Sequence, residues 1–154
     1  MSSSQFQLQS QNTYEYQFLV HVGDQMPDFE VPLNNGSVFK RSDQRGKVVM
    51  LQFTASWCGV CRKKCLILKR KSGKKLKDKD FVLIGLDYQE EPEKVNDFAK
   101  QMNISYPLAY DDSGEIFHSI AAKGAGVTRN IIINRNGKII YLSCLFRMDK
   151  FNEM

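Results

Sequence analysis

The stretch "GKVVMLQFTASWCGVC", residues 46–61, decides the fold, because it joins a buried strand directly to a helix that opens with two cysteines. Residues 47–55 form a near-continuous apolar run of strand length, which predicts a strand covered on both faces of its sheet. Cys58 and Cys61 follow at the predicted first turn of a helix. Since the amide groups and the dipole at a helix start favour negative charge, the sequence predicts a stabilised thiolate there.

Strand and helix patterns continue on both sides of this unit. Two short strands around Asn35-Gly36 predict an N-terminal hairpin. The later patterns are a buried strand over residues 80–88, helices over 91–103 and 114–123, and a hairpin over 129–146 that turns at Asn136-Gly137. This order predicts an α/β fold with a mixed central sheet and helices on both faces.

Length and composition indicate one globular domain. The chain has 154 residues, of which 42% are hydrophobic and 25% charged, and no stretch has the roughly 18 apolar residues that cross a bilayer. The net charge of +5 comes from basic residues gathered between Arg62 and Lys79, and this local cluster does not indicate nucleic-acid binding. The Ser- and Gln-rich residues 1–21 predict a flexible tether ahead of a domain over 22–154.

The spacing of the cysteines favours redox chemistry. In a Cys-x-x-Cys on a first helical turn, the leading sulfur is exposed and the second lies behind it. Cys58 is therefore the predicted nucleophile and Cys61 the resolving thiol. A zinc site needs a second ligand pair, and His21, His118 and Cys144 show no paired spacing. The sequence thus predicts no metal site and no cofactor.

The motifs "WCGVC", "GKVVMLQFTASWC" and "NIIINRNGKII" resemble those of thioredoxin-fold proteins. With "GDQMPDF" upstream, the chain more narrowly resembles the TlpA/ResA-type thiol:disulfide interchange proteins, relatives of the AhpC/TSA and redoxin groups, from about Val22 to Phe146. The resemblance implies a thioredoxin-like three-layer sandwich with an added N-terminal hairpin. It also implies a thiol:disulfide oxidoreductase that acts on protein thiols or disulfides and works with a redox partner protein.

The same resemblance suggests where the protein acts. Proteins of this group are commonly extracytoplasmic and often anchored to a bacterial membrane. The sequence "SSSQ", residues 2–5, resembles the stretch that follows the lipid-bearing cysteine of a lipoprotein. We therefore expect an extracytoplasmic location, in the periplasm or on a membrane facing it, with residues 1–21 as a tether that has lost its lipid anchor.

One departure from the family pattern concerns the loop that faces the active site, where thioredoxins carry a cis-proline. Thr128 stands at that position, between Val127 and Arg129. A cis bond before a residue other than proline costs roughly 3 kcal/mol, so the Val127–Thr128 peptide is either held cis at that cost or trans. Peroxiredoxin relatives also lack this proline and place an arginine nearby. This keeps a thiol peroxidase open as an alternative, although their Pro-x-x-x-Thr-x-x-Cys pattern is missing.

A second departure is the absence of the family's proton acceptors. Gln52 stands where thioredoxins carry a buried acid, and Lys64 stands where ResA-type proteins carry a glutamate. The charge of Lys64 should lower both thiol pKa values and make the disulfide more oxidising, although a solvated basic helix face explains it equally well. Trp57, Gly59 and Val60 flank Cys58 and are predicted to dock substrate or tune the thiol.

The third departure is Cys65, which shares a helical stripe with Cys58 and Cys61. Cys65 is either a small core residue or an accessory thiol. Cys144, in the pattern of the final strand, is interpreted as a core residue. Because Gln52, Lys64 and Thr128 replace working parts of the family, a degenerate thioredoxin-like domain that binds a partner or a metal remains an alternative to the enzyme.

Overall fold

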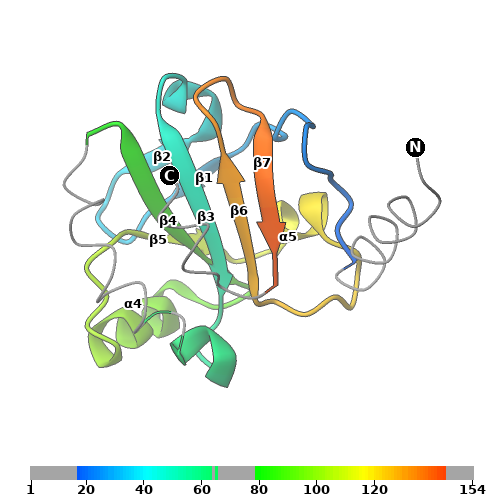
Figure 1. The fold of residues 1–154 in the computed structure, drawn as a ribbon. Helices are drawn as coiled ribbons and strands as arrows, with labels where there is room; N and C mark the ends of the chain where they lie inside the picture. The colour runs from blue at the N-terminus through cyan, green and yellow to red at the C-terminus, as the bar shows by residue number, and fades with distance from the viewer. Residues whose placement is uncertain (1–16, 64, 66–78, 145–154) are drawn as a thin grey trace.

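The computed structural model describes residues 17–63, 65 and 79–144. Five strands form its central sheet: β3 (Val48–Thr54), β4 (Phe81–Tyr88), β5 (Leu108–Asp111), β6 (Arg129–Ile133) and β7 (Ile139–Ser143). Their order is β5-β4-β3-β6-β7 (Figure 1). β3 pairs in parallel with β4, β4 in parallel with β5, and β6 runs antiparallel to both β3 and β7. The predicted mixed sheet is confirmed.

Helices and a hairpin complete the described chain. They are β1 (Glu30–Pro32), β2 (Val38–Lys40), the 3-10 helix η1 (Arg41–Gln44), and the helices α4 (Pro92–Gln101) and α5 (Glu115–Ile120). Residues 59–63 and 65 are also helical and follow β3. β1 and β2 pair antiparallel, which confirms the predicted N-terminal hairpin. Within the described ranges, no helix is long and apolar enough to cross a membrane.

The two faces of β3 pack against different helices, because successive side chains of a strand point to opposite faces. Met50 belongs to a buried cluster with Val95 and Phe98 of α4. Phe53 belongs to a second cluster with α5, where its ring lies 5.7 Å from that of Phe117. The sheet is thus covered on both sides, as a three-layer sandwich requires.

Strand β5 has no counterpart in the sequence-based prediction. It is only four residues long and follows Pro107, so it carries little strand pattern of its own. Tertiary contact creates it: Leu108 is fully buried, and a side chain at Gly85 of the neighbouring strand would lie 2.4 Å from Leu108 Cδ2. The close approach at Gly85 also lets Tyr106 lie against the sheet beneath the cysteine helix.

Helix α5 is shorter than the predicted range 114–123. It ends at Ile120, because Ala121 is extended and forms an isolated β-bridge with Phe18. The backbone N–H of Leu19 donates to the Ile120 carbonyl at 2.8 Å. Phe18 is buried, so the folded domain begins before the predicted boundary at residue 22, while residues 1–16 of the predicted tether lie outside the described chain.

Candidate active site

Cys58 lies at the turn between the end of β3 and the following helix. Its N–H donates to the Ala55 carbonyl at 3.2 Å, and its own carbonyl accepts from the N–H of Arg62 at 3.1 Å, which closes the first helical turn. The amide of Cys61 then donates to Cys58 Sγ at 3.2 Å. The sulfur therefore occupies the anion-binding position of a helix start, as the sequence predicts.

The two thiols differ sharply in acidity. Cys58 is half-buried and Cys61 fully buried, and both are free thiols. Burial opposes ionisation of Cys58, but hydrogen bonds from Cys61, Thr128 and the Val60 backbone outweigh it and lower the pKa of this thiol. Burial, reinforced by the neighbouring Cys58, raises the pKa of Cys61 to about 12. The ready thiolate is therefore Cys58.

Thr128 contacts both sulfurs at once. Its Oγ1 lies 3.1 Å from Cys58 Sγ and 3.0 Å from Cys61 Sγ. No peptide bond is cis within the described residues, so the Val127–Thr128 bond is trans. A hydroxyl thus occupies the place where the family resemblance implies a proline, and it adds a hydrogen-bond partner that proline lacks.

The two neighbours of Thr128 face the interior. Val127 and Arg129 are buried, and the Arg129 guanidinium lies over the Phe18 ring, 4.5 Å from its centroid. Nε of Arg129 donates to the Gly126 carbonyl at 2.8 Å. Of the three predicted residues in this loop, Thr128 is the one that the structure brings against the cysteines.

Exposed side chains surround Cys58. Trp57 is 66% exposed and Val60 51% exposed, and Gly59 between them is exposed too. Exposed large apolar groups beside a reactive sulfur are suited to contact another protein. Lys64, the remaining predicted tuning residue, lies outside the described residues.

Cys65 is buried against the sheet. Gln52 Nε2 donates to Cys65 Sγ at 3.8 Å, and Gln52 Oε1 accepts from the Tyr106 hydroxyl at 2.9 Å. Burial raises the pKa of Cys65, so this thiol is inert at neutral pH. Gln52 therefore connects a thiol and a phenol where the family resemblance implies a proton acceptor. Cys144 is half-buried and packs on the edge of the larger core cluster.

Two carboxyl groups near the cysteines were missed by the sequence analysis. Glu90 accepts hydrogen bonds from the N–H of Ser56 at 2.6 Å and from its hydroxyl, and so holds the loop before Cys58. The Nε of Arg62 donates to the Ser56 carbonyl at 2.8 Å on the other side. Asp87, at the end of β4, is fully buried beside Glu90. The sequence signal for Asp87 was an acidic residue inside the predicted buried strand 80–88, because burial of an acid needs a reason. Glu90 follows that strand and had no such signal.

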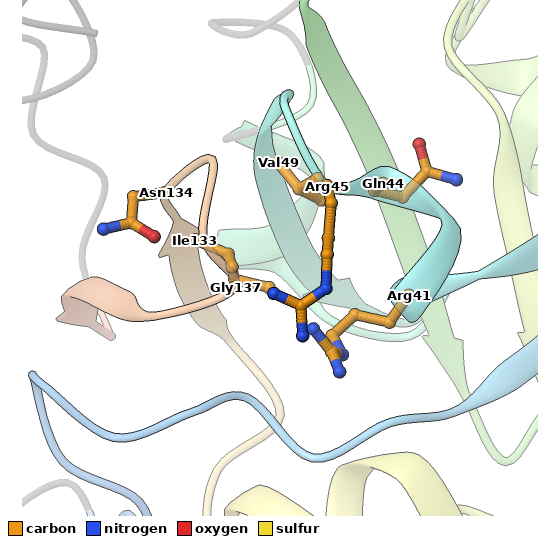
Figure 2. Close-up of a pocket in the computed structure, with 7 residues that line it drawn as sticks. All are labelled: Arg41, Gln44, Arg45, Val49, Ile133, Asn134 and Gly137. Atoms are coloured by element: carbon orange, nitrogen blue, oxygen red, sulfur yellow. The ribbon is translucent and has the colours of Figure 1, made fainter.

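A hollow lies near the opposite end of β3. Arg41 and Arg45 line it together with Val49, where β3 begins (Figure 2). It is separate from the cysteine end, which β3 reaches at Thr54. Among the described residues, no group of three or more His, Cys, Asp or Glu side chains is placed to hold a metal ion.

A free thiol pair at the start of a helix, on a five-stranded mixed sheet covered by helices on both faces, defines a thioredoxin-like protein. The chain belongs to the Redoxin family, whose model matches residues 21–147.

Individual relatives agree with this assignment. The thiol-disulfide oxidoreductase ResA of Bacillus thuringiensis subsp. konkukian is 30% identical over 121 residues, which are 79% of this chain and 68% of the relative. A candidate protein disulfide isomerase from Bacteroides thetaiotaomicron is 45% identical in its solution structure, with a TM-score of 0.83 over 90% of this chain and 87% of that one. A candidate thiol:disulfide interchange protein DsbE from Chlorobium tepidum is 30% identical, with a TM-score of 0.73 over 85% and 90%.

Proposed function

We propose that the protein is a thiol:disulfide oxidoreductase that exchanges disulfides with the thiols of other proteins, with Cys58 as the attacking sulfur and Cys61 as the resolving one. The observation that carries this proposal is the hydrogen bond from the Cys61 amide to Cys58 Sγ at the helix start. It stabilises a thiolate on a half-buried sulfur that a partner can reach, while the second thiol waits behind it.

The exchange proceeds in two displacements. The Cys58 thiolate attacks one sulfur of a partner disulfide, forms a mixed disulfide and releases the other partner sulfur as a thiolate. Cys61 then loses its proton and attacks Cys58 Sγ, which releases the second partner sulfur. The partner gains two electrons and the enzyme is left with a Cys58–Cys61 disulfide. The reverse sequence oxidises a partner dithiol.

The partner chemistry follows from the surface around the sulfur. Trp57, Gly59 and Val60 present exposed apolar surface beside Cys58, which suits an unfolded or extended protein segment better than a small charged thiol. The Thr128 hydroxyl contacts both sulfurs and favours the ionisation of each. A second redox protein then restores the starting oxidation state.

We place the protein outside the cytoplasm, in the periplasm or tethered to a membrane that faces it. The resemblance of residues 2–5 to a lipoprotein sequence supports this location. Disulfides also persist in oxidising compartments, where an exchange enzyme has protein substrates. Fractionation of cells that express the full-length gene, with lipid labelling, tests the location.

The test of function is an equilibrium titration in graded thiol/disulfide buffers, quenched by alkylation and analysed by peptide mass. We expect a reversible Cys58–Cys61 disulfide with a reduction potential above the roughly −270 mV of thioredoxin, because a stabilised Cys58 thiolate favours the reduced pair. A Cys65→Ser variant should give the same potential. If the pair never forms, or Cys65 traps Cys61, the binding-domain alternative replaces the enzyme. Peroxide consumption coupled to a thiol reductant, without exchange on proteins, would favour a thiol peroxidase instead.

A further inference from the structure

The hollow at the end of the molecule opposite the cysteines takes no part in the exchange mechanism. Its floor is apolar and consists of Val49 of β3 and Ile133 of β6, which are register partners with buried side chains. Arg41 and Arg45 border it from the chain between β2 and β3, where Arg41 begins η1 and Arg45 follows it. Figure 2 shows their guanidinium groups pointing toward one another. Two positive charges therefore meet beside an apolar floor.

Both guanidinium groups reach the turn between β6 and β7. Nη1 of Arg45 donates to the Asn136 carbonyl at 3.3 Å. At the next residue, Gly137, a Cβ would lie 2.8 Å from Nη1 of Arg41. Gly137 also has a φ of +84°, a left-handed conformation that favours glycine. The Asn-Gly turn therefore leaves the space that the Arg41 guanidinium occupies, and it brings the two arginines to adjacent residues.

The charge of Arg41 is buried and only partly balanced. Its side chain is 9% exposed, and a guanidinium remains charged even when it is buried. Its one ion pair among the described residues joins Nε to Asp28 Oδ1 at 3.8 Å, and Nε has no hydrogen-bond partner there. The same Oδ1 already accepts from the backbone N–H groups of Phe29 and Ser42, each at 3.0 Å. Because a buried charge needs hydrogen bonds, donors of Arg41 are left for a ligand.

The other charged groups nearby do not neutralise the hollow. Arg45 is exposed and has no ion pair within the described chain. Asp43, the acid of η1, is exposed and is likewise unpaired there. On the β6–β7 turn, Arg135 lies 3.9 Å from Asp80, while Lys138 is exposed and adds a further positive charge. The balance at this end favours an anion.

We propose that Arg41 and Arg45 together bind a dianionic phosphate group, either free phosphate or a phosphomonoester. Each guanidinium presents parallel N–H donors in a planar fork, and a carboxylate fills only one such fork. A phosphomonoester has three free oxygens and nearly two negative charges, which match two forks and two guanidinium charges. The apolar floor keeps water from one side of the anion and strengthens its attraction to both arginines.

This site is independent of the proposed exchange. The arginines border the hollow where β3 begins, whereas the cysteines follow the other end of β3 at Thr54. A phosphate bound there leaves Cys58 open to a partner. It also balances charge where η1 meets the β6–β7 turn, so it should stabilise the folded protein by mass action.

The test is a titration of the nitrogen-15-labelled protein with inorganic phosphate at neutral pH, with ionic strength held constant by potassium chloride. We expect saturable shifts of the Nε–H resonances of Arg41 and Arg45 and of the Gly137 amide. Sulfate should compete, because it is also a tetrahedral dianion, whereas acetate should not. Glycerol phosphate distinguishes the two sources: tighter binding than inorganic phosphate indicates a phosphomonoester, and equal binding indicates free phosphate.

Matched variants separate a built site from a basic surface. Arg45→Gln removes one fork at an exposed position and should weaken phosphate binding about tenfold or more. Arg41→Gln should do the same, with its fold checked by the backbone amide spectrum. Lys138→Gln makes the same change of charge on the neighbouring turn and should keep the affinity within about twofold. Exchange through Cys58 should be unchanged in Arg45→Gln. Equal shifts with acetate, wild-type affinity in Arg45→Gln, or an equal loss in Lys138→Gln would each overturn the inference.

Discussion

Two pairs of like groups meet where β3 and β4 end, and each pair holds its proton on one member. In the thiol pair, Cys58 is half-buried and has a lowered pKa, whereas Cys61 is buried and its pKa is about 12. In the carboxyl pair, Asp87 and Glu90 are both buried, yet only Glu90 receives the two hydrogen bonds of Ser56. In both pairs, burial raises the pKa of one member and hydrogen bonds lower the pKa of the other, and the charge of Lys94 adds to the effect on Glu90.

The difference fits what each pair does. The thiol pair must meet a partner, so one sulfur is accessible and its acidity comes from the helix start. The carboxyl pair needs no contact with the partner, since both groups are buried and Glu90 binds the loop before Cys58. The covered pair therefore keeps a proton on Asp87 at neutral pH.

Breaking the thiol pair should have the largest effect. Cys58→Ala should abolish exchange, because the resolving thiol is buried and protonated. Cys61→Ala should still attack but stop at the mixed disulfide, so that one partner chain stays bound to each enzyme molecule. Non-reducing gels and intact mass after mixing with a disulfide-bonded protein measure both results.

Cys144→Ser is the matched control for this experiment and should exchange at the wild-type rate. Full turnover by Cys61→Ala would mean that another thiol resolves the mixed disulfide. The triple-cysteine stripe makes Cys65 the thiol to test next, through the double variant with Cys61→Ala.

Breaking the carboxyl pair should change stability. The pKa of Asp87 is raised from 3.8 to about 9 in the folded protein, so the folded state keeps a proton that the unfolded chain loses at lower pH. The stability that this proton provides is complete below about pH 4 and is lost as the pH rises towards 9. Asp87→Asn has no such proton to lose and should be more stable than wild type at pH 8, by on the order of 2 kcal/mol.

Urea unfolding of the reduced protein at pH 5 and pH 8 measures this effect. The advantage of Asp87→Asn should grow between the two pH values, whereas Asp97→Asn, on the exposed face of α4, should show no such growth. An equal change at both pH values would mean that Asp87 is ionised in the folded protein, contrary to the comparison of the two pairs.

The thiol pair could be predicted from sequence and the carboxyl pair could not, for a physical reason. Cys58 and Cys61 are set by contacts close in the chain, the turn after a buried strand and the first turn of a helix. Asp87 and Glu90 reach the site because β4 pairs with β3 in parallel, a contact between residues far apart in sequence. The same limit hid β5, whose four residues gain their strand form from tertiary packing.

Thr128 shows which part of a contact the sequence can predict and which part only the structure gives. The family resemblance placed it opposite the cysteines, but only the structure shows one hydroxyl within 3.1 Å of both sulfurs. Arg129, placed in the same loop by the same resemblance, faces the interior instead. Sequence position identified the loop, and packing decided which side chain of that loop meets the thiols.

Removing the Thr128 hydroxyl should have the smallest effect and should sharpen the comparison. Because a hydroxyl gives its proton to the more negative sulfur, it acts mainly on the Cys58 thiolate. Thr128→Val should raise the pKa of Cys58 and lower its acid dissociation constant about tenfold, the equivalent of one hydrogen bond of about 1.4 kcal/mol. Thr128→Ser should keep the wild-type value. Iodoacetamide alkylation of the reduced protein across pH, read at the Cys58 peptide, measures the change. If the alkylation profile of Thr128→Val matches that of wild type, the helix start alone lowers the pKa of Cys58 relative to that of Cys61. The thiol pair would then have no side-chain donor equivalent to Ser56, which binds Glu90.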